Sequence, residues 1–197
     1  CERNFRLYCE TYFPHTFALG WSDDHLKVIG QIETSVLHGG LFATAMPRGS
    51  GKTSLAEAAC EWATSYGHRD FITLIGSDED AAGLMLDSIK TEFETNELLA
   101  EDFPEVCFPI ACLDGIPHRA AGQLFKGKRT HIAWSAGELV LPTIPGSPAS
   151  GAVIKARGIT GRLRGMKVKK PDGKAIRPSL VVIDDPQTDG SARSPSQ

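Results

Sequence analysis

Apolar residues recur along this chain in two patterns, helical spacing and short continuous runs. Helical spacing predicts four helices, over residues 4–13, from Ser22 to Gly39, over 52–66 and from Ser77 to about residue 98. Ser77, with Asp80 three residues later, resembles a capping box at the start of the fourth helix. Continuous apolar runs predict buried strands at 41–46, 71–76 and 179–185. We also expect a hairpin over 130–142, with Ala136-Gly137 in its turn, and a strand over 152–158.

The order of these elements predicts an α/β fold. Strands that alternate with helices run parallel, so we expect a central, mostly parallel sheet flanked by helices. The run SLVVIDD at 179–185 is apolar up to its two carboxylates, which predicts a strand in the middle of the sheet, buried on both faces. Residues 1–40 are predicted to form a helical segment that leads to a core at 41–197. The chain starts without Met and stops in a loop-like stretch, which is typical of a fragment of a longer protein.

Composition narrows the class of protein. The 197 residues are 41% hydrophobic and 23% charged, which indicates one globular domain and excludes a disordered tail, collagen or a coiled coil. No apolar stretch is long enough for a membrane span, so no membrane partner is expected. The five cysteines include no C-x-x-C pair and the six histidines have no metal-ligand spacing, which indicates a reduced, intracellular chain without a zinc site.

Positive charge is concentrated in one stretch of the sequence. Residues 155–177 contain nine lysines and arginines and a single acid, Asp172, although the whole chain has a formal net charge of −3. A basic stretch on an acidic domain often contacts phosphate, either of a nucleotide or of nucleic acid, whereas a solvated loop is the simpler interpretation. We expect this stretch to lie next to the active-site end of the sheet.

The segment MPRGSGKT, residues 46–53, is the strongest motif. It lies between a predicted strand and a predicted helix, the context of a phosphate-binding loop, although Met46 replaces the usual first glycine. The glycines let successive backbone N–H groups face phosphate oxygens, Lys52 would reach the β- and γ-phosphates of ATP, and Thr53 would ligate Mg²⁺. A chance glycine turn before a helix is the simpler alternative. The predicted nucleotide-binding residues are Pro47, Arg48, Gly49, Ser50, Gly51, Lys52, Thr53 and Ser54.

A second motif, LVVIDDP at 180–186, ends in two carboxylates. An acid at the end of a buried strand can hold the Mg²⁺ of an ATP complex, and we assign that role to Asp184. Asp185, one residue further, could orient and deprotonate the attacking water. Asp and Pro also favour turns, so a plain turn remains the alternative for both residues.

Together these motifs resemble the large subunit of tailed-phage terminases. The resemblance rests on Arg48 in the glycine-rich loop, GWSDDHLKVI at 20–29, GITGRLRGMK at 158–167 and RPSLVVIDDP at 177–186. It implies a P-loop NTPase fold of the ASCE or RecA-like type, in a motor that translocates double-stranded DNA with ATP and Mg²⁺. It further implies a homo-oligomeric ring, a portal protein and a terminase small subunit as partners, the bacterial host cytoplasm as location, and a nuclease domain in the parent protein.

The resemblance also assigns two arginines to the γ-phosphate. Arg48 matches the arginine of the phosphate loop, and Arg164 best matches the one that a neighbouring subunit supplies, with Arg162 as its competitor. Guanidinium groups stabilise charge on a transferring phosphoryl group. A surface cation is the alternative for Arg48, and a contact with the DNA backbone or solvent is the alternative for Arg164.

Adenine recognition is assigned to His25 and Trp21. Family members often place a Gln near a helix start upstream of the loop, and His25 occupies the comparable place. Its ring could hydrogen-bond the adenine edge, while the Trp21 ring could stack on the base. A helix-cap histidine and a packing tryptophan are the alternatives.

Two other classes of protein share these motifs. A superfamily 2 helicase-like DNA translocase would carry a closely similar phosphate loop, but it would normally have Asp-Glu at positions 184–185 and Thr in place of Arg48. A P-loop kinase or regulatory nucleotide-binding domain usually lacks the late acidic pair, although residues 159–177 could imitate its lid.

Overall fold

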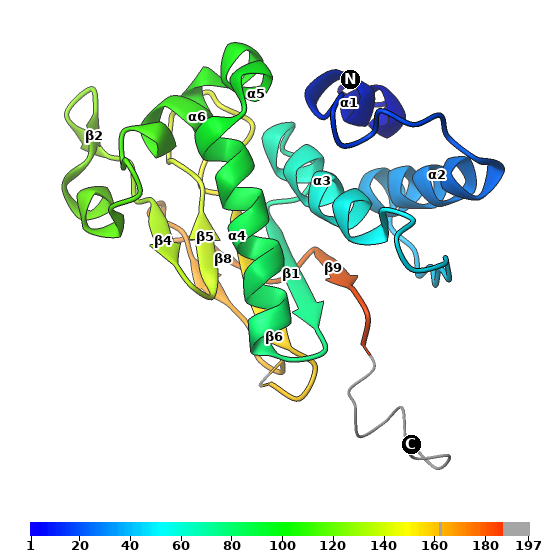
Figure 1. The fold of residues 1–197 in the computed structure, drawn as a ribbon. Helices are drawn as coiled ribbons and strands as arrows, with labels where there is room; N and C mark the ends of the chain where they lie inside the picture. Colours follow the sequence, from blue (N-terminus) through cyan, green and yellow to red (C-terminus); the bar gives the residue numbers. More distant parts are fainter. Residues whose placement is uncertain (162, 187–197) are drawn as a thin grey trace.

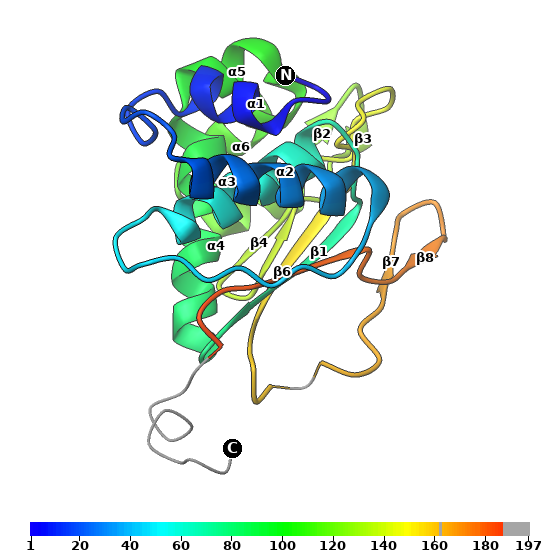
Figure 2. The same cartoon turned by 90° about the vertical axis from the view of Figure 1, so that its right-hand side faces the viewer.

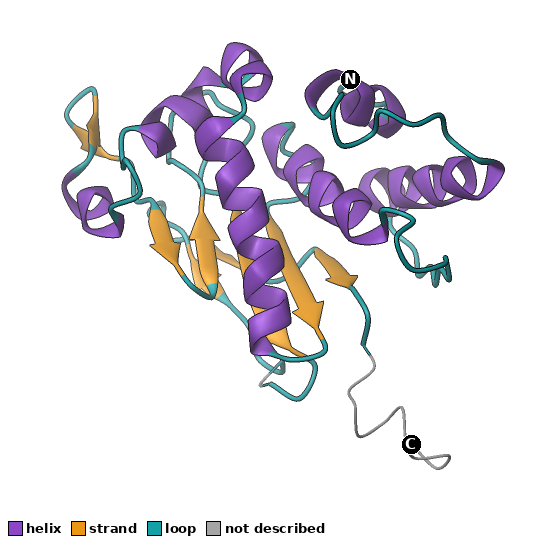
Figure 3. Ribbon diagram, viewed as in Figure 1, coloured by secondary structure: helices purple, strands orange, loops and turns teal. Residues whose placement is uncertain are grey.

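A mixed five-stranded sheet forms the centre of the molecule (Figures 1 and 3). The structure is a computed structural model, and it describes residues 1–161 and 163–186. The strand order is β4-β5-β6-β1-β9, with the bounds β1 Phe71–Gly76, β4 Ala133–Ser135, β5 Glu138–Val140, β6 Val153–Gly158 and β9 Leu180–Ile183. β6, β1 and β9 are parallel, whereas β4 and β5 form an antiparallel hairpin. The predicted α/β class is therefore confirmed, but the sheet is mixed rather than mostly parallel.

Helices lie against one face of the sheet, and two small hairpins lie outside it (Figures 1 and 2). The helices are α1 Phe5–Tyr12, α2 Asp23–His38, α3 Lys52–Ser65, α4 Glu79–Thr95, α5 Glu97–Asp102 and α6 Pro104–Ala111, followed by the short 3₁₀ helix η1 Pro117–Gly122. One hairpin consists of β2 Leu124–Phe125 and β3 Lys128–Arg129, and another of β7 Val168–Lys169 and β8 Ala175–Ile176. Figure 2 shows α4 on one side of the strands and the β7–β8 hairpin on the other.

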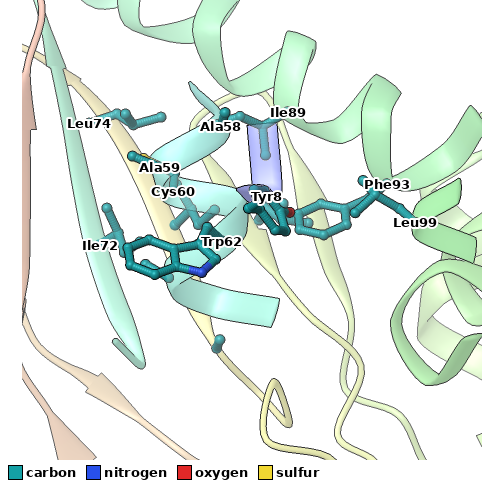
Figure 4. Close-up of a cluster of buried hydrophobic side chains, with 14 of the residues drawn as sticks. Tyr8, Ala58, Ala59, Cys60, Trp62, Ile72, Leu74, Ile89, Phe93 and Leu99 are labelled. Carbon is teal, nitrogen blue, oxygen red and sulfur yellow. The ribbon is translucent and has the colours of Figure 1, made fainter. Parts of the chain in front are cut away.

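The main apolar core lies between the helices and one face of the sheet. Trp62 of α3 is completely buried there, with Tyr8 of α1 on one side and Ile72 of β1 on the other (Figure 4). The Trp62 indole donates to the Cys1 carbonyl at 3.2 Å, so the N-terminus is fixed to α3. Helix α1 is thus part of the same core as the sheet, because its apolar face is buried against α3 and the residues around it.

Two predicted strands differ from the structure. Residues 41–46 form no strand, and Leu41 is 98% exposed. The strand predicted at 179–185 exists as β9 but lies at an edge of the sheet, not in its middle. The prediction assumed that a continuous apolar run has a paired strand along each edge. In the described part of the chain, β9 pairs only with β1.

Local predictions were closer to the structure. The hairpin over 130–142 turns at Ala136-Gly137 as expected, and the strand over 152–158 is β6. Helix α4 begins one residue later than the predicted capping box, because Asp78 rather than Ser77 accepts from the Ala81 N–H, at 2.7 Å. All five cysteines are free, and no helix among the described residues has the length and apolarity needed to cross a bilayer.

Candidate functional site

The glycine loop, residues 47–51, leads directly into helix α3. Gly49 and Gly51 have φ angles of 76° and 75°, in the left-handed region where a side chain would be strained. Gly51 is the N-cap of α3, so the free backbone N–H groups of the first helical turn are presented beside the loop. Such a loop at a helix N-terminus provides clustered N–H donors and the positive end of the helix dipole, which together suit an anion.

The two sequence motifs meet at one hydrogen bond. The Thr53 hydroxyl, on the first turn of α3, donates to Asp184 Oδ2 at 2.6 Å, although 131 residues separate the two positions. Asp184 follows β9 directly, and its backbone N–H donates to the Ile75 carbonyl at 2.9 Å, which continues the β1–β9 pairing. Helix α3 and strand β9 therefore bring one hydroxyl and one carboxylate to the same point.

This pair fits a magnesium ion that also binds a nucleotide. Adjacent ligands of an octahedral Mg²⁺ at 2.0–2.1 Å lie roughly 2.9 Å apart, close to the Thr53–Asp184 oxygen separation. Mg²⁺ often takes one or two protein oxygens and completes its shell with phosphate and water. In residues 1–161 and 163–186, no cluster of three or more His, Cys, Asp or Glu side chains is arranged around a metal position.

Lys52 is held inside the glycine loop. Its Nζ donates to the Met46 carbonyl at 2.7 Å, and the Ser50 hydroxyl donates to the Pro47 carbonyl at 2.7 Å. The Lys52 ammonium group thus connects the first residue of α3 to Met46, the residue that precedes the glycine loop. Lys52 would have to exchange the Met46 carbonyl for a phosphate oxygen when nucleotide binds.

Asp185 lies at the carboxyl end of β9 and is exposed. Its φ angle is 41°, so the backbone leaves the extended conformation immediately after Asp184. Aspartate tolerates the left-handed region better than most residues. The turn separates the two carboxylates: Asp184 contacts Thr53, whereas the side chain of Asp185 faces solvent and remains available to a water molecule.

His25 and Trp21 lie beside the loop, but they contact protein groups. His25 Nε2 is 2.9 Å from the Ser50 carbonyl, and Nδ1 is 2.7 Å from the Ser22 hydroxyl. The Trp21 indole donates to the Glu10 carboxylate at 2.7 Å, and its ring lies edge-on to His25 at a centroid distance of 5.9 Å. Both His25 ring nitrogens therefore have protein partners, and the assignment of His25 and Trp21 to the adenine base stays a prediction.

The remaining predicted site residues have fewer contacts. Arg48, in the glycine loop, and Arg164, in a turn at 164–165, are exposed and form no ion pair within the described residues. Ser54 is half-buried in the first turn of α3. The competitor Arg162 lies outside the described residues.

The basic stretch 155–177 divides into two parts. Lys155 pairs with Glu138 at 3.0 Å and Lys170 with Asp70 at 3.5 Å. Asp70 immediately precedes β1, and Ile176 of the β7–β8 hairpin packs on Phe71, so this hairpin lies at the amino end of the strands. Among the described residues of this stretch, 159–161 and 163–167 come after the carboxyl end of β6 and before the hairpin. The expectation that the whole stretch lies at the active-site end is wrong.

Glu57 is a site residue that the sequence did not indicate. It lies one helical turn after Thr53, and its carboxylate accepts from the Ser88 hydroxyl of α4 at 3.0 Å. Burial raises the pKa of Glu57 to about 7, and the nearby Asp184 carboxylate adds to that rise. One turn further, Glu61 is fully buried, and burial raises its pKa as well. The spacing of four residues indicates that Glu57 lies on the same side of α3 as Thr53. It does not show whether Glu57 or Glu61 contacts α4.

Comparison of the chain with protein-family models, curated proteins and solved structures found no match.

Proposed function

We propose that this chain is a magnesium-dependent ATP hydrolase with a P-loop NTPase core of the ASCE or RecA-like type. The observation that carries the proposal is the 2.6 Å hydrogen bond between Thr53 and Asp184, which joins the glycine loop helix to the acidic strand. Phosphoryl transfer needs a phosphate cradle, a metal site and a water-orienting group within one small volume. In this proposal the glycine loop supplies the phosphate cradle, Thr53 and Asp184 supply the metal site, and Asp185 supplies the water-orienting group.

Each group has a distinct role in this proposal. The N–H groups of the loop and Lys52 bind the β- and γ-phosphates, while Thr53 and Asp184 hold Mg²⁺. Bound Mg²⁺ would supply positive charge to the phosphate oxygens. Asp185 accepts the proton of the attacking water, and Arg48 stabilises charge on the γ-phosphoryl group.

We further propose that this hydrolase is the motor domain of a phage terminase large subunit that translocates double-stranded DNA. The support is the resemblance of the glycine loop, the 158–167 segment and the acidic strand, with Arg48 in the place where a helicase normally has Thr. The same resemblance implies a homo-oligomeric ring, a portal protein and a terminase small subunit as partners, and the cytoplasm of a bacterial host as location. Arg164 would act on the nucleotide of a neighbouring subunit.

Single substitutions test the hydrolase. Lys52→Ala should lose Mg²⁺·ATP affinity, measured by calorimetry, because the β/γ-phosphate contact disappears. Asp185→Asn should still bind Mg²⁺·ATP but lose about 10²–10⁴ in turnover, the usual contribution of general acid–base catalysis. Lys27→Ala and Asp172→Asn are matched controls on the exposed surface. Equal ATP affinity and turnover in Lys52→Ala and Lys27→Ala would refute the assignment.

Mixed assemblies test the arginine from a neighbouring subunit. Loss of an arginine finger costs about 10³–10⁵ in rate with little change in ground-state binding. Mixing Arg164→Ala subunits with Lys52→Ala subunits should restore some hydrolysis, because one interface then pairs an intact loop with an intact arginine. Stable mixed assemblies without any recovery would mean that Arg164 acts on the nucleotide of its own subunit or has no catalytic role.

A further inference from the structure

The tautomer of His25 is fixed by its two partners. A carbonyl oxygen can only accept, so Nε2, 2.9 Å from the Ser50 carbonyl, carries the proton. In the neutral ring Nδ1 is then an acceptor, and it faces the Ser22 hydroxyl at 2.7 Å and the Ser22 backbone N–H at 3.3 Å. The imidazole therefore connects the N-cap of α2 to the backbone of the glycine loop.

The contact reaches the most adaptable part of the loop. Ser50 lies between Gly49 and Gly51, both at positive φ. In a planar trans peptide the carbonyl and the next N–H point in opposite directions. When the Ser50 carbonyl points at His25, the Gly51 N–H must point away from it. Orienting one carbonyl thus also orients the donor that precedes α3.

His25 is itself held in place by a rigid support. Ser22 and His25 form a reciprocal capping box at the start of α2, and the buried Ile29 and Val36 anchor that helix in the core. Trp21 lies against the His25 ring and is fixed to Glu10 of α1. A loop with two glycines would otherwise lose conformational entropy each time a ligand orders it. A rigid partner outside the loop reduces this entropy loss.

We propose that His25 is a positioning residue, which holds the Ser50–Gly51 peptide in the orientation that presents the Gly51 N–H to phosphate. This inference rests on the proposed nucleotide site. It assigns His25 to the phosphate loop instead of to the adenine base, and it acts through the backbone rather than by touching the reacting atoms.

Three substitutions separate the loop contact from the helix cap. Glutamine and glutamate at this position can both accept from the Ser22 N–H in a capping box. Only His25→Gln keeps an N–H donor for the Ser50 carbonyl, whereas His25→Glu places a carboxylate there. His25→Ala removes both contacts.

The first measurement uses the whole chain without nucleotide. Backbone ¹⁵N relaxation should show faster motion of the Gly49 and Gly51 amides in His25→Glu than in wild type and His25→Gln. Thermal midpoints of His25→Gln and His25→Glu should agree, because both retain the cap. Unchanged loop amides in His25→Glu would overturn the inference.

The second measurement is Mg²⁺·ADP affinity by calorimetry. His25→Glu should bind about three- to tenfold more weakly than His25→Gln, the worth of one hydrogen bond, while His25→Gln stays near wild type. Equal affinity in the two variants, with Lys52→Ala still defective, would overturn the inference and leave the proposed function intact. Equal ADP binding in wild type and Lys52→Ala would refute the nucleotide site itself, and the loop relaxation would still report whether His25 holds the peptide.

Discussion

Strands β6 and β9 are both parallel neighbours of β1 and both have apolar sequences, yet their surroundings differ. In β6, Val153 and Ile154 are completely buried. In β9, Val181 is 51% exposed and Ile183 is 53% exposed. An apolar run therefore shows that a strand can be buried on both faces, but it does not show that this chain covers it.

The difference has two structural causes. On its outer edge β6 pairs with β5, and α4 packs over it, whereas β9 pairs only with β1 within the described residues. Leu180 and Val182 of β9 join the main core, but Val181 and Ile183 alternate to the opposite face, away from α3 and α4. The candidate site lies at the end of this less covered strand.

Removing buried methyl groups should expose the contrast most strongly. Ile154→Ala should lower the free energy of unfolding by about 2–5 kcal/mol, because it leaves a cavity in a closed core. Ile183→Ala should cost less than about 1 kcal/mol, since an exposed side chain loses little on truncation. Urea denaturation of both variants measures the two values, and equal costs would mean that the outward face of β9 is covered in solution.

The sequence predicted those parts of the fold that depend on neighbouring residues in the chain. The start of α2 after Ser22, the turn at Ala136-Gly137 and the range of α3 all follow from local chemistry. Residues 41–46 and the place of β9 in the sheet depend on distant partners, which a hydrophobic pattern does not specify. The predicted position of the α4 N-cap was wrong by one residue, because Ser77 and Asp78 are both favourable N-cap residues.

The candidate site shows the same limit. The motifs predict that Thr53 and Asp184 share one site, and the structure places their oxygens 2.6 Å apart. The contacts of His25 with the Ser50 carbonyl and of Glu57 with the Ser88 hydroxyl could not be predicted, because each joins residues that are distant in the sequence. Spacing along a helix identifies a face, but the partner on that face comes only from the packed structure.

A smaller effect should come from Glu57 of α3, which accepts from Ser88 of α4 and is close enough to Asp184, at the end of β9, for that carboxylate to raise its pKa. Its folded-state pKa of about 7 exceeds the ordinary value of 4.5, so the folded protein binds more protons between these values. Stability should therefore fall as pH rises from about 4.5 to 7. Glu57→Gln should remove this loss and be more stable than wild type at pH 8 by about 1–2 kcal/mol, after allowance for solvent screening.

Chemical denaturation at pH 5 and pH 8, without added metal, tests this expectation. Glu101→Gln is the matched control, because Glu101 is exposed on α5. A stability gain of Glu57→Gln that is the same at both pH values would show that the carboxyl group does not titrate in this range in the folded protein.

The smallest effect concerns association through the edge of β9. Unpaired edge strands with apolar side chains favour pairing between molecules, and a lysine on such an edge opposes it. Val181→Lys should therefore lower concentration-dependent association, measured by sedimentation velocity, with little change in the free energy of unfolding. Leu84→Lys is the matched control: Leu84 is 73% exposed on α4, so the same charge is added away from any strand edge. Equal reductions in both variants would indicate a general effect of charge, whereas a reduction confined to Val181→Lys would show that strand β9, and not exposed apolar surface as such, drives association.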